Sequence, residues 1–279
     1  MKILSVLVLL LVGSNSNAQQ IYLNVFGGVS NYQGDLQDKK FTLEQSHPAF
    51  GAGIVYEISN KLFARANITL GKISGDDKKS IKNEARNLNF TSAITDIHLG
   101  IEYNLADLYE YPMSPYIFAG ISGYHFAPYT TTNNNNDNIF LQPLGTEGQG
   151  FFEGRKKYKL NQIAIPFGGG LKLAITDNIR FGFEAGFRKL FTDHLDDVSR
   201  TYIKDKGLLT TNNGPLSTEL SFRGDELSPP LNYPTNNLIR GNPKSKDWYY
   251  FGLLSVNIRM PSKEGFSRKK SANTGCPRW

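Results

Sequence analysis

The sequence predicts an all-β protein, an eight-stranded antiparallel transmembrane β-barrel with a filled, charged lumen and long outer loops. In residues 179–188, apolar side chains alternate strictly with a second set that includes Arg180, Glu184 and Arg188, and successive side chains of a strand point to opposite faces. A soluble sheet does not normally cover a face with three such charges. A membrane barrel turns that face to its lumen and the apolar face to lipid. Long and short connections also alternate along the chain, as they do in such barrels.

The N-terminus reads as a secretory signal peptide over residues 1–18. A basic start is followed by the apolar run 3–12 and by small residues at Ser16 and Ala18, which is the order of a cleavable signal. The run is too short to cross a bilayer as a helix. We therefore expect cleavage after Ala18 and localisation of the mature chain to the outer membrane, with the barrel in residues 19–260 and a basic periplasmic tail in residues 261–279.

Eight stretches show the alternation of a half-apolar strand. In the first, Ile21, Leu23 and Val25 would face lipid. The fifth stretch is ambiguous, because both of its faces are apolar or small. Pro261 ends the last, since proline cannot donate to a strand ladder. The predicted strands are residues 21–32, 48–58, 62–71, 90–104, 115–126, 161–175, 179–190 and 247–260.

The connections fall into two classes that alternate. An even strand number places both termini beside the short turns, and in outer-membrane barrels the short turns are periplasmic. The asparagine run from 133 to 136 is expected to be solvated linker, whereas the glycines of residues 141–150 indicate a fixed turn. The short or moderate connections are 59–61, 105–114 and 176–178, and the long loops are 33–47, 72–89, 127–160 and 192–246.

Charged side chains on the inward faces would meet in a lumen that eight strands make narrow enough for side chains to fill. Buried charges are costly unless they are paired, and the two signs are nearly balanced here. We therefore expect an ion-pair network that closes the lumen to diffusion. Its members are Glu57, Arg65, Asp96, Glu102, Lys172, Arg180, Glu184, Arg188 and Arg259.

The chain carries a formal charge of +6, but most of the excess lies in the tail after Pro261. The barrel itself is close to neutral, so we expect no nucleic-acid partner. Outer-membrane lipid is the expected environment of the strands. Nothing in the sequence indicates a cofactor.

An acidic motif at the rim, Asp193, Asp196 and Asp197, follows the seventh strand. With His194 as a base and Ser199 as a nucleophile it could form a hydrolytic site, or its carboxylates could bind calcium. The alternative is a structured loop base, in which Asp and Thr cap local turns. We favour that alternative and expect no catalytic, cofactor or metal site, with a rim hydrolase as the least favoured function.

The tail ends with Cys276, Arg278 and Trp279. A single cysteine excludes an internal disulfide and is available for an intermolecular one in an oxidising compartment. Arg and Trp are preferred anchors of interfaces. We therefore expect the tail to dock on a periplasmic partner, to which Cys276 could be cross-linked; the alternative is a frayed terminus.

Several stretches together resemble an outer-membrane barrel family of Bacteroidota that includes PorG, a component of the type IX secretion system. They are 25–28 with 31–35, 73–77, 86–90, 141–150, and 186–188 with 191–198. The resemblance covers nearly the whole mature chain.

This resemblance implies a non-enzymatic component of protein transport and gliding motility. Its implied partners are a periplasmic ring lipoprotein and the soluble partner of that lipoprotein. A family match fixes the fold more firmly than the role. The open alternative is a surface-binding or adhesin barrel that uses its long outer loops.

Overall fold

The computed structural model describes residues 20–39, 42–80, 82–132, 135–234 and 238–261. The predicted signal peptide and the tail residues Cys276, Arg278 and Trp279 lie outside these ranges. In chain order the elements are β1 (Ile21–Gln33), β2 (His47–Glu57), β3 (Leu62–Asp76), η1 (Asp77–Lys79), η2 (Glu84–Arg86), β4 (Asn89–Asn104), β5 (Met113–Thr132), β6 (Asn135–Phe140), α2 (Leu141–Leu144), β7 (Asn161–Thr176), β8 (Ile179–Leu190), α3 (Lys206–Asn213), α4 (Pro215–Ser221), η3 (Gly224–Glu226) and β9 (Trp248–Arg259).

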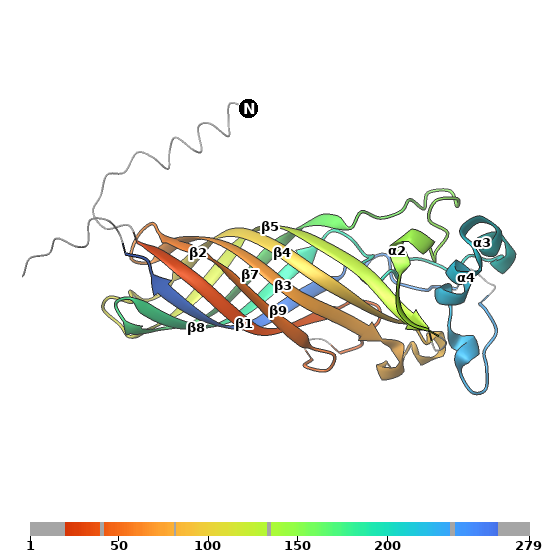
Figure 1. Ribbon diagram of the computed structural model, residues 1–279, viewed down its shortest axis with the longest axis horizontal. Coiled ribbons are helices and arrows are strands. Elements are labelled where there is room, and N and C mark those ends of the chain that lie inside the picture. Colours follow the sequence, from red (N-terminus) through yellow and green to blue (C-terminus); the bar gives the residue numbers. More distant parts are fainter. Residues whose placement is uncertain (1–19, 40–41, 81, 133–134, 235–237, 262–279) are drawn as a thin grey trace, which may run out of the picture.

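Eight of these strands form a closed antiparallel barrel (Figure 1). The hydrogen-bonded order is β4-β3-β2-β1-β9-β8-β7-β5, and pairing of β4 with β5 closes the ring. Pairing of β1 with β9 joins the first strand of the chain to the last. The short strand β6 pairs with β5 alone among the described strands and adds nothing to the wall. The predicted eight-stranded antiparallel barrel is confirmed.

The outward side chains form an apolar belt around the barrel. Ile97 in β4 and Phe183 in β8 are 55% and 52% exposed, whereas the adjacent Asp96, His98 and Glu184 are buried. Closure leaves no strand edge, and a barrel without edges satisfies its backbone inside a bilayer. The belt is therefore the lipid-facing surface of a transmembrane barrel. Its larger members are Phe50, Ile54, Ile68, Ile97, Leu99, Ile117, Ile121, Ile163, Leu171, Ile175, Phe181, Phe183, Leu254 and Ile258.

The two ends of the barrel differ. Short connections join β2 to β3, β4 to β5 and β7 to β8 at one end, here named the short-turn end. The long connections, with helices α2, α3 and α4, lie together at the opposite, long-loop end (Figure 1). None of the helices in the described residues is both long and apolar enough to cross a membrane.

Two of the predicted loops are shorter than expected because the neighbouring strands continue into them. The loop predicted from residue 72 begins with strand, since β3 pairs with β4 up to Asp76 opposite Asn89. The loop predicted from residue 127 begins with the end of β5, and the asparagine run contributes Asn135 to β6 opposite Thr132. Polar residues sustain a strand there because the hydrogen bonds come from the backbone of the partner strand and no apolar face is required.

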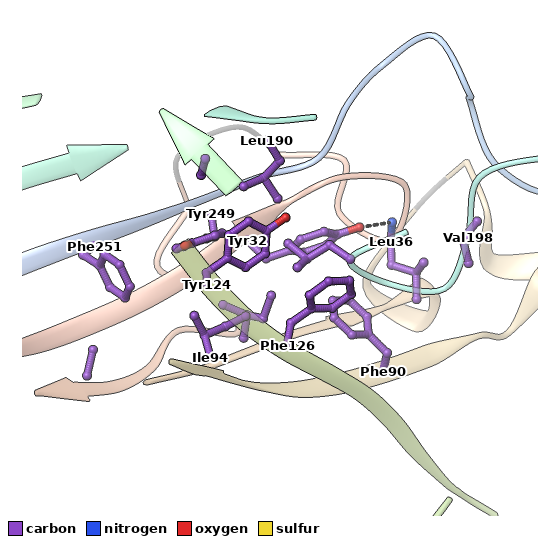
Figure 2. Packing of buried hydrophobic residues seen from close by; sticks show 14 of the residues in the cluster. Tyr32, Leu36, Phe90, Ile94, Tyr124, Phe126, Leu190, Val198, Tyr249 and Phe251 are labelled. Atoms are coloured by element: carbon purple, nitrogen blue, oxygen red, sulfur yellow. Dashed lines mark hydrogen bonds between the residues drawn. The ribbon is translucent and has the colours of Figure 1, made fainter. Parts of the chain in front are cut away.

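Most of the hydrophobic core lies inside the barrel near the long-loop end. Tyr32, Phe90, Phe126 and Tyr249 are at most 2% exposed, and Figure 2 shows these rings converging from different strands. Tyr32 packs edge-on against Phe90, with ring centroids 4.9 Å apart. This aromatic plug separates the charged part of the lumen from the loops.

Candidate functional site: a filled lumen beneath an ordered cap

The lumen side chains lie in layers along the barrel axis. In the layer near the short-turn end, Arg180 lies 3.8 Å from Glu57 (Nη2 to Oε2) and stacks over the ring of Tyr22, 4.4 Å from its centroid. The Tyr109 hydroxyl, from the connection between β4 and β5, donates to Glu57 Oε2 at 2.9 Å. This connection therefore helps to close the short-turn end.

The middle layer is the densest part of the network. Arg65 on β3 donates two hydrogen bonds to Glu184 on β8, at 2.7 Å and 3.1 Å, in the bidentate geometry that guanidinium favours. Arg65 also lies 3.5 Å from Glu102, which pairs in turn with Lys172. The Tyr116 hydroxyl donates to Glu184 at 2.9 Å. Four charges from four strands are thus neutralised within one layer.

A third layer lies beneath the aromatic plug. Arg188 on β8 contacts Asp96 on β4, with Nε 3.2 Å from Oδ2 and Nη2 3.2 Å from Oδ1. The Tyr249 hydroxyl donates to the same carboxylate at 2.7 Å. Arg188 also lies over the Phe251 ring, 5.1 Å from its centroid.

Arg259 differs from the other predicted members of the network. It is half-buried at the end of β9 and makes no ion pair shorter than 4.0 Å with the residues that the structure describes. The end of a strand is less enclosed by other side chains than its centre, so this guanidinium reaches water.

Little space remains among the charges. A cavity lined by Asn24, Arg65, Glu184 and Asn257 has a volume of about 10 Å³, which holds about one water molecule. Asn24 Oδ1 and Asn257 Nδ2 make no hydrogen bond within the described part of the protein. The space has room for a water that can bind a lining amide, and a solute would not fit.

The long loops form an ordered structure that we call the cap, which comprises the described parts of residues 34–46, 77–88, 141–160 and 191–247. Its centre is Arg240, which is 3% exposed. The Arg240 guanidinium donates to Glu147 Oε1 at 3.0 Å, to the Asp197 carbonyl at 2.6 Å and to the Ser221 carbonyl at 2.9 Å. One side chain thus joins the two longest loops of the chain.

A second buried arginine joins the connection between β3 and β4 to the other segments of the cap. Arg86 forms a bidentate pair with Asp77, at 2.7 Å and 2.6 Å. It also donates to the carbonyls of Asp35 and Arg240. Because backbone carbonyls accept these bonds, the bonds fix the positions of the loop backbones relative to one another. The loops therefore form one connected structure.

The acidic rim motif is buried in this cap. Asp193 Oδ2 accepts from the Ser199 hydroxyl at 2.8 Å, and Asp196 Oδ1 accepts from the Val198 amide at 2.9 Å. Asp197 accepts from the Tyr158 hydroxyl at 2.7 Å. Its φ is 65°, a left-handed conformation that Asp tolerates better than most residues. These contacts are those of a turn that fixes the start of the loop.

The contacts of this segment do not assemble a hydrolytic pair. Ser199 donates to Asp193, whereas the ring of His194 stacks on Tyr158 with centroids 4.9 Å apart. His194 Nδ1 has no hydrogen-bond partner among the described residues. Nor does any group of three or more His, Cys, Asp or Glu side chains in the described ranges have an arrangement that could hold a metal ion.

Burial changes the acidity of the rim carboxyls. It raises the pKa of Asp193 to about 7 and that of Asp197 to about 6. The pKa values of Asp196 and Asp247 are also raised, first by burial and then by the neighbouring carboxylates. Desolvation disfavours a charged carboxylate, so the cap takes up protons at a pH at which exposed aspartates would have lost them.

Several residues that organise the site were not among the sequence candidates. Glu147 lies in the glycine-containing segment 141–150, for which the sequence indicated a fixed turn, and Gly145 and Gly148 there have φ of 62° and 78°. Arg86 and Arg240 lie in segments without periodicity, so no pattern marks them as buried. Tyr116 and Tyr249 stand at inward strand positions, but the strand period does not reveal which carboxylate each hydroxyl would reach.

Closure of the sheet, the apolar belt and the filled lumen define a transmembrane β-barrel with an ordered cap at one end. The family model that matches this chain covers residues 1–144, just over half of its length, and is described as Domain of unknown function (DUF6089). The chain belongs to this family. A search of curated proteins by sequence found no match.

Solved structures with a similar arrangement have low sequence identity to this chain. Neisserial surface protein A is 10% identical, with a TM-score of 0.45 over 86% of this chain and 97% of that one. Ail of Yersinia pestis, in complex with the heparin analogue sucrose octasulfate, is 9% identical, with a TM-score of 0.41 over 87% and 99%. The N-terminal barrel domain of Pseudomonas aeruginosa OprF is 11% identical, with a TM-score of 0.33 over 86% and 97%. The fold assignment rests on the strand pairing of the chain itself.

Proposed function

We propose that this protein is a non-enzymatic structural barrel of the outer membrane, closed to diffusion, with its long-loop end at the cell surface. The observation that supports this most directly is the lumen, in which Arg65, Glu102, Lys172 and Glu184 neutralise one another around space for about one water. A transport pore needs a continuous aqueous path. A closed barrel serves instead as an anchor for what binds its ends.

Recording of ionic current across planar bilayers tests the closed lumen. The purified protein, inserted in planar bilayers, should give no stable ohmic current, whereas a porin inserted from the same detergent gives defined steps. Reproducible steps from the wild-type protein would refute the proposal of a closed anchor. Cell fractionation tests the outer-membrane placement independently.

At a finer level, we propose that the anchored assembly is the type IX secretion machinery. The support is the resemblance carried by segments such as 31–35, 86–90 and 191–198, several of which lie in the cap or at its junction with the strands. The proposed partners are the periplasmic ring lipoprotein and its soluble partner, reached through residues 261–279. Cys276, Arg278 and Trp279 would provide the contacts.

Co-purification tests this assignment. The full-length protein, extracted in mild detergent, should retain a periplasmic lipoprotein detectable by mass spectrometry, and truncation after Pro261 should release it. A species that is shifted on non-reducing gels in the wild type and absent in Cys276→Ser would show the cross-link. Retention of the same partner by the truncated chain would exclude the tail as its docking segment.

A surface-binding barrel is the second candidate, and the order of the cap favours it. Arg240 and Arg86 together fix four loops by buried hydrogen bonds, so the cap presents a defined surface at the proposed cell exterior. Cells that carry the Arg240→Met variant should then lose surface attachment while the barrel remains in the membrane. Unchanged attachment would leave the secretion role as the better proposal.

A further inference from the structure

A crevice of about 800 Å³ lies where the apolar belt meets the cap. Its floor is a row of outward aromatic side chains on three adjacent strands: Phe167 of β7, Phe187 of β8, and Trp248 and Tyr250 of β9. Neighbouring rings in this row have centroids 5.8 to 6.1 Å apart. The volume is in the range of small-molecule sites, roughly 300–1,000 Å³.

The wall of the crevice is polar and comes from the loops. The segment that follows β1 contributes Gln37, the connection between β3 and β4 contributes Asn83, and the segment before β9 contributes Asn242, Ser245 and Lys246. Amides and a hydroxyl offer both donors and acceptors. The wall suits a ligand covered with hydroxyl groups.

The charges of the wall do not select a strongly charged ligand. Asp35 and Asp38 stand against Lys82 and Lys246, two of each sign. Both carboxylates already accept hydrogen bonds from the loops. Asp35 accepts from the Asn242 amide at 2.9 Å, and Asp38 accepts from the Ser80 hydroxyl at 2.8 Å. The combination of flat aromatic faces with balanced polar groups is one that binds a sugar ring, whose C–H face packs on aromatics and whose hydroxyls need hydrogen bonds.

The floor of the crevice continues into the lipid-facing surface. Phe183, four residues along β8 from Phe187 and on the same face, is 52% exposed in the belt. Aromatic side chains at this level of a barrel mark the membrane interface. A sugar in the crevice would therefore sit above lipid chains, and acyl chains attached to it could lie along the belt.

We propose that this crevice binds the sugar head group of a glycolipid of the outer leaflet. The proposal rests on the placement of the long-loop end at the cell surface. It adds a ligand to the anchor barrel and does not depend on the identity of the secretion partners.

The chain supplies its own reporter for this site. It contains two tryptophans, of which Trp248 lies in the crevice floor and Trp279 in the tail. In a full-length Trp279→Phe protein in detergent micelles, tryptophan emission therefore reports on Trp248 alone. The probes are lipopolysaccharide, the deacylated oligosaccharide of the same lipopolysaccharide, and phosphatidylglycerol.

We expect lipopolysaccharide to change the emission saturably and phosphatidylglycerol to have little effect. Phe187→Ala should weaken the apparent affinity about tenfold, which corresponds to roughly 1.4 kcal/mol. Phe50→Ala, at an outward phenylalanine of β2 that does not line the crevice, is the matched control and should leave the affinity unchanged. Ser245→Phe fills the crevice from an exposed loop position and provides a second test if Phe187→Ala does not fold.

Equal responses to lipopolysaccharide and phosphatidylglycerol would overturn the proposal, since they would indicate nonspecific lipid contact. Equal affinity for the deacylated oligosaccharide would overturn the assignment to a glycolipid and indicate a soluble sugar. Equal loss in Phe187→Ala and Phe50→Ala would place the binding elsewhere. The binding measurement uses purified protein, so failure to find a secretion partner would not change its outcome. Fractionation of the protein away from the outer membrane would refute its proposed location independently of the binding result.

Discussion

At the scale of single residues, Arg65 shows how the lumen tolerates charge. Its guanidinium is almost completely buried, and it contacts the carboxylates of both Glu184 and Glu102. A buried pair gains little over an apolar pair of the same shape, but removal of one partner leaves a charge that neither water nor protein satisfies. Removal of one member of the network is therefore expected to lower the free energy of unfolding by more than the intact network contributes to it.

Arg65→Met should lower the free energy of unfolding by about 3–5 kcal/mol, because it leaves a buried acid unpaired. Urea titration of the barrel in lipid vesicles measures this. The matched control is Lys39→Met, which breaks the Lys39–Glu44 pair, 3.1 Å apart with side chains 66% and 54% exposed. That change should cost about 0–1 kcal/mol. Equal effects of the two substitutions would show that the lumen charges are not desolvated.

Asp193 makes the stability of the cap depend on pH. Its pKa in the folded protein is raised by burial to about 7, above its value in an unfolded chain, so the folded cap binds the extra proton. The stabilisation is complete below the unfolded pKa, about 3.9, and is lost as the pH rises through about 7. Protease resistance of the segment 192–246 should therefore fall between about pH 4 and pH 7.

Asp193→Asn should flatten this fall, because an amide does not titrate. His194 has a pKa that burial lowers, so its contribution is lost in the opposite direction, as the pH falls below about 6.5. The two contributions have opposite signs, so the histidine cannot produce the fall. Asp197, whose pKa burial raises to about 6, titrates in the same interval, so Asp193→Asn should reduce the fall and not abolish it. An identical pH profile in Asp193→Asn would exclude this residue as the origin of the effect.

At the scale of elements, strands and loops follow different rules. Alternation in residues 21–32 and 179–190 predicted which side chains face lipid, and the exposures of Ile21 and Phe183, 41% and 52%, agree with it. The ends of the strands were less predictable, because β3 and β5 continue beyond the apolar belt as backbone ladders between polar residues. The helices α3 and α4 lie in a loop without a pattern that marks them.

Arg240 should stabilise the cap but not the barrel. Arg240→Met removes hydrogen bonds to Glu147 and to the carbonyls of Asp197 and Ser221, so residues 192–246 should become sensitive to added protease. Heat-modifiable migration on gels, which reports the folded barrel, should persist. Arg200→Met, at an exposed position of the same loop, is the control and should stay resistant. Loss of the folded barrel in Arg240→Met would show that cap and barrel fold as one unit.

At the scale of the whole molecule, the cost of placing a charge on the apolar belt should depend on its depth in the membrane. Ile97 and Ile175 are equally exposed, at 55% and 54%, but Ile97 lies in the middle of β4 and Ile175 beside the turn after β7. Ile97→Lys should destabilise the barrel in a bilayer by about 2–4 kcal/mol, and Ile175→Lys by about 0–1 kcal/mol. Urea titration in lipid vesicles compares them. Equal costs would contradict a membrane whose midplane crosses β4 near Ile97.

The sequence by itself determined the closed barrel and the two faces of its wall. The reason is local: successive residues of a strand point to opposite sides, and lipid and lumen demand opposite chemistry. Inward positions such as Arg65 and Glu184 could therefore be assigned from sequence alone, although their contacts could not.

Only the tertiary structure decided which of these residues meet. Arg65 and Glu184 are 119 positions apart, and their contact depends on the register and tilt of strands that are not adjacent in the wall. Glu147 and Arg240, 93 positions apart, meet in loops that have no period to read. The crevice combines both causes, because the strand pattern supplies its aromatic floor and the folding of distant loops supplies its polar wall.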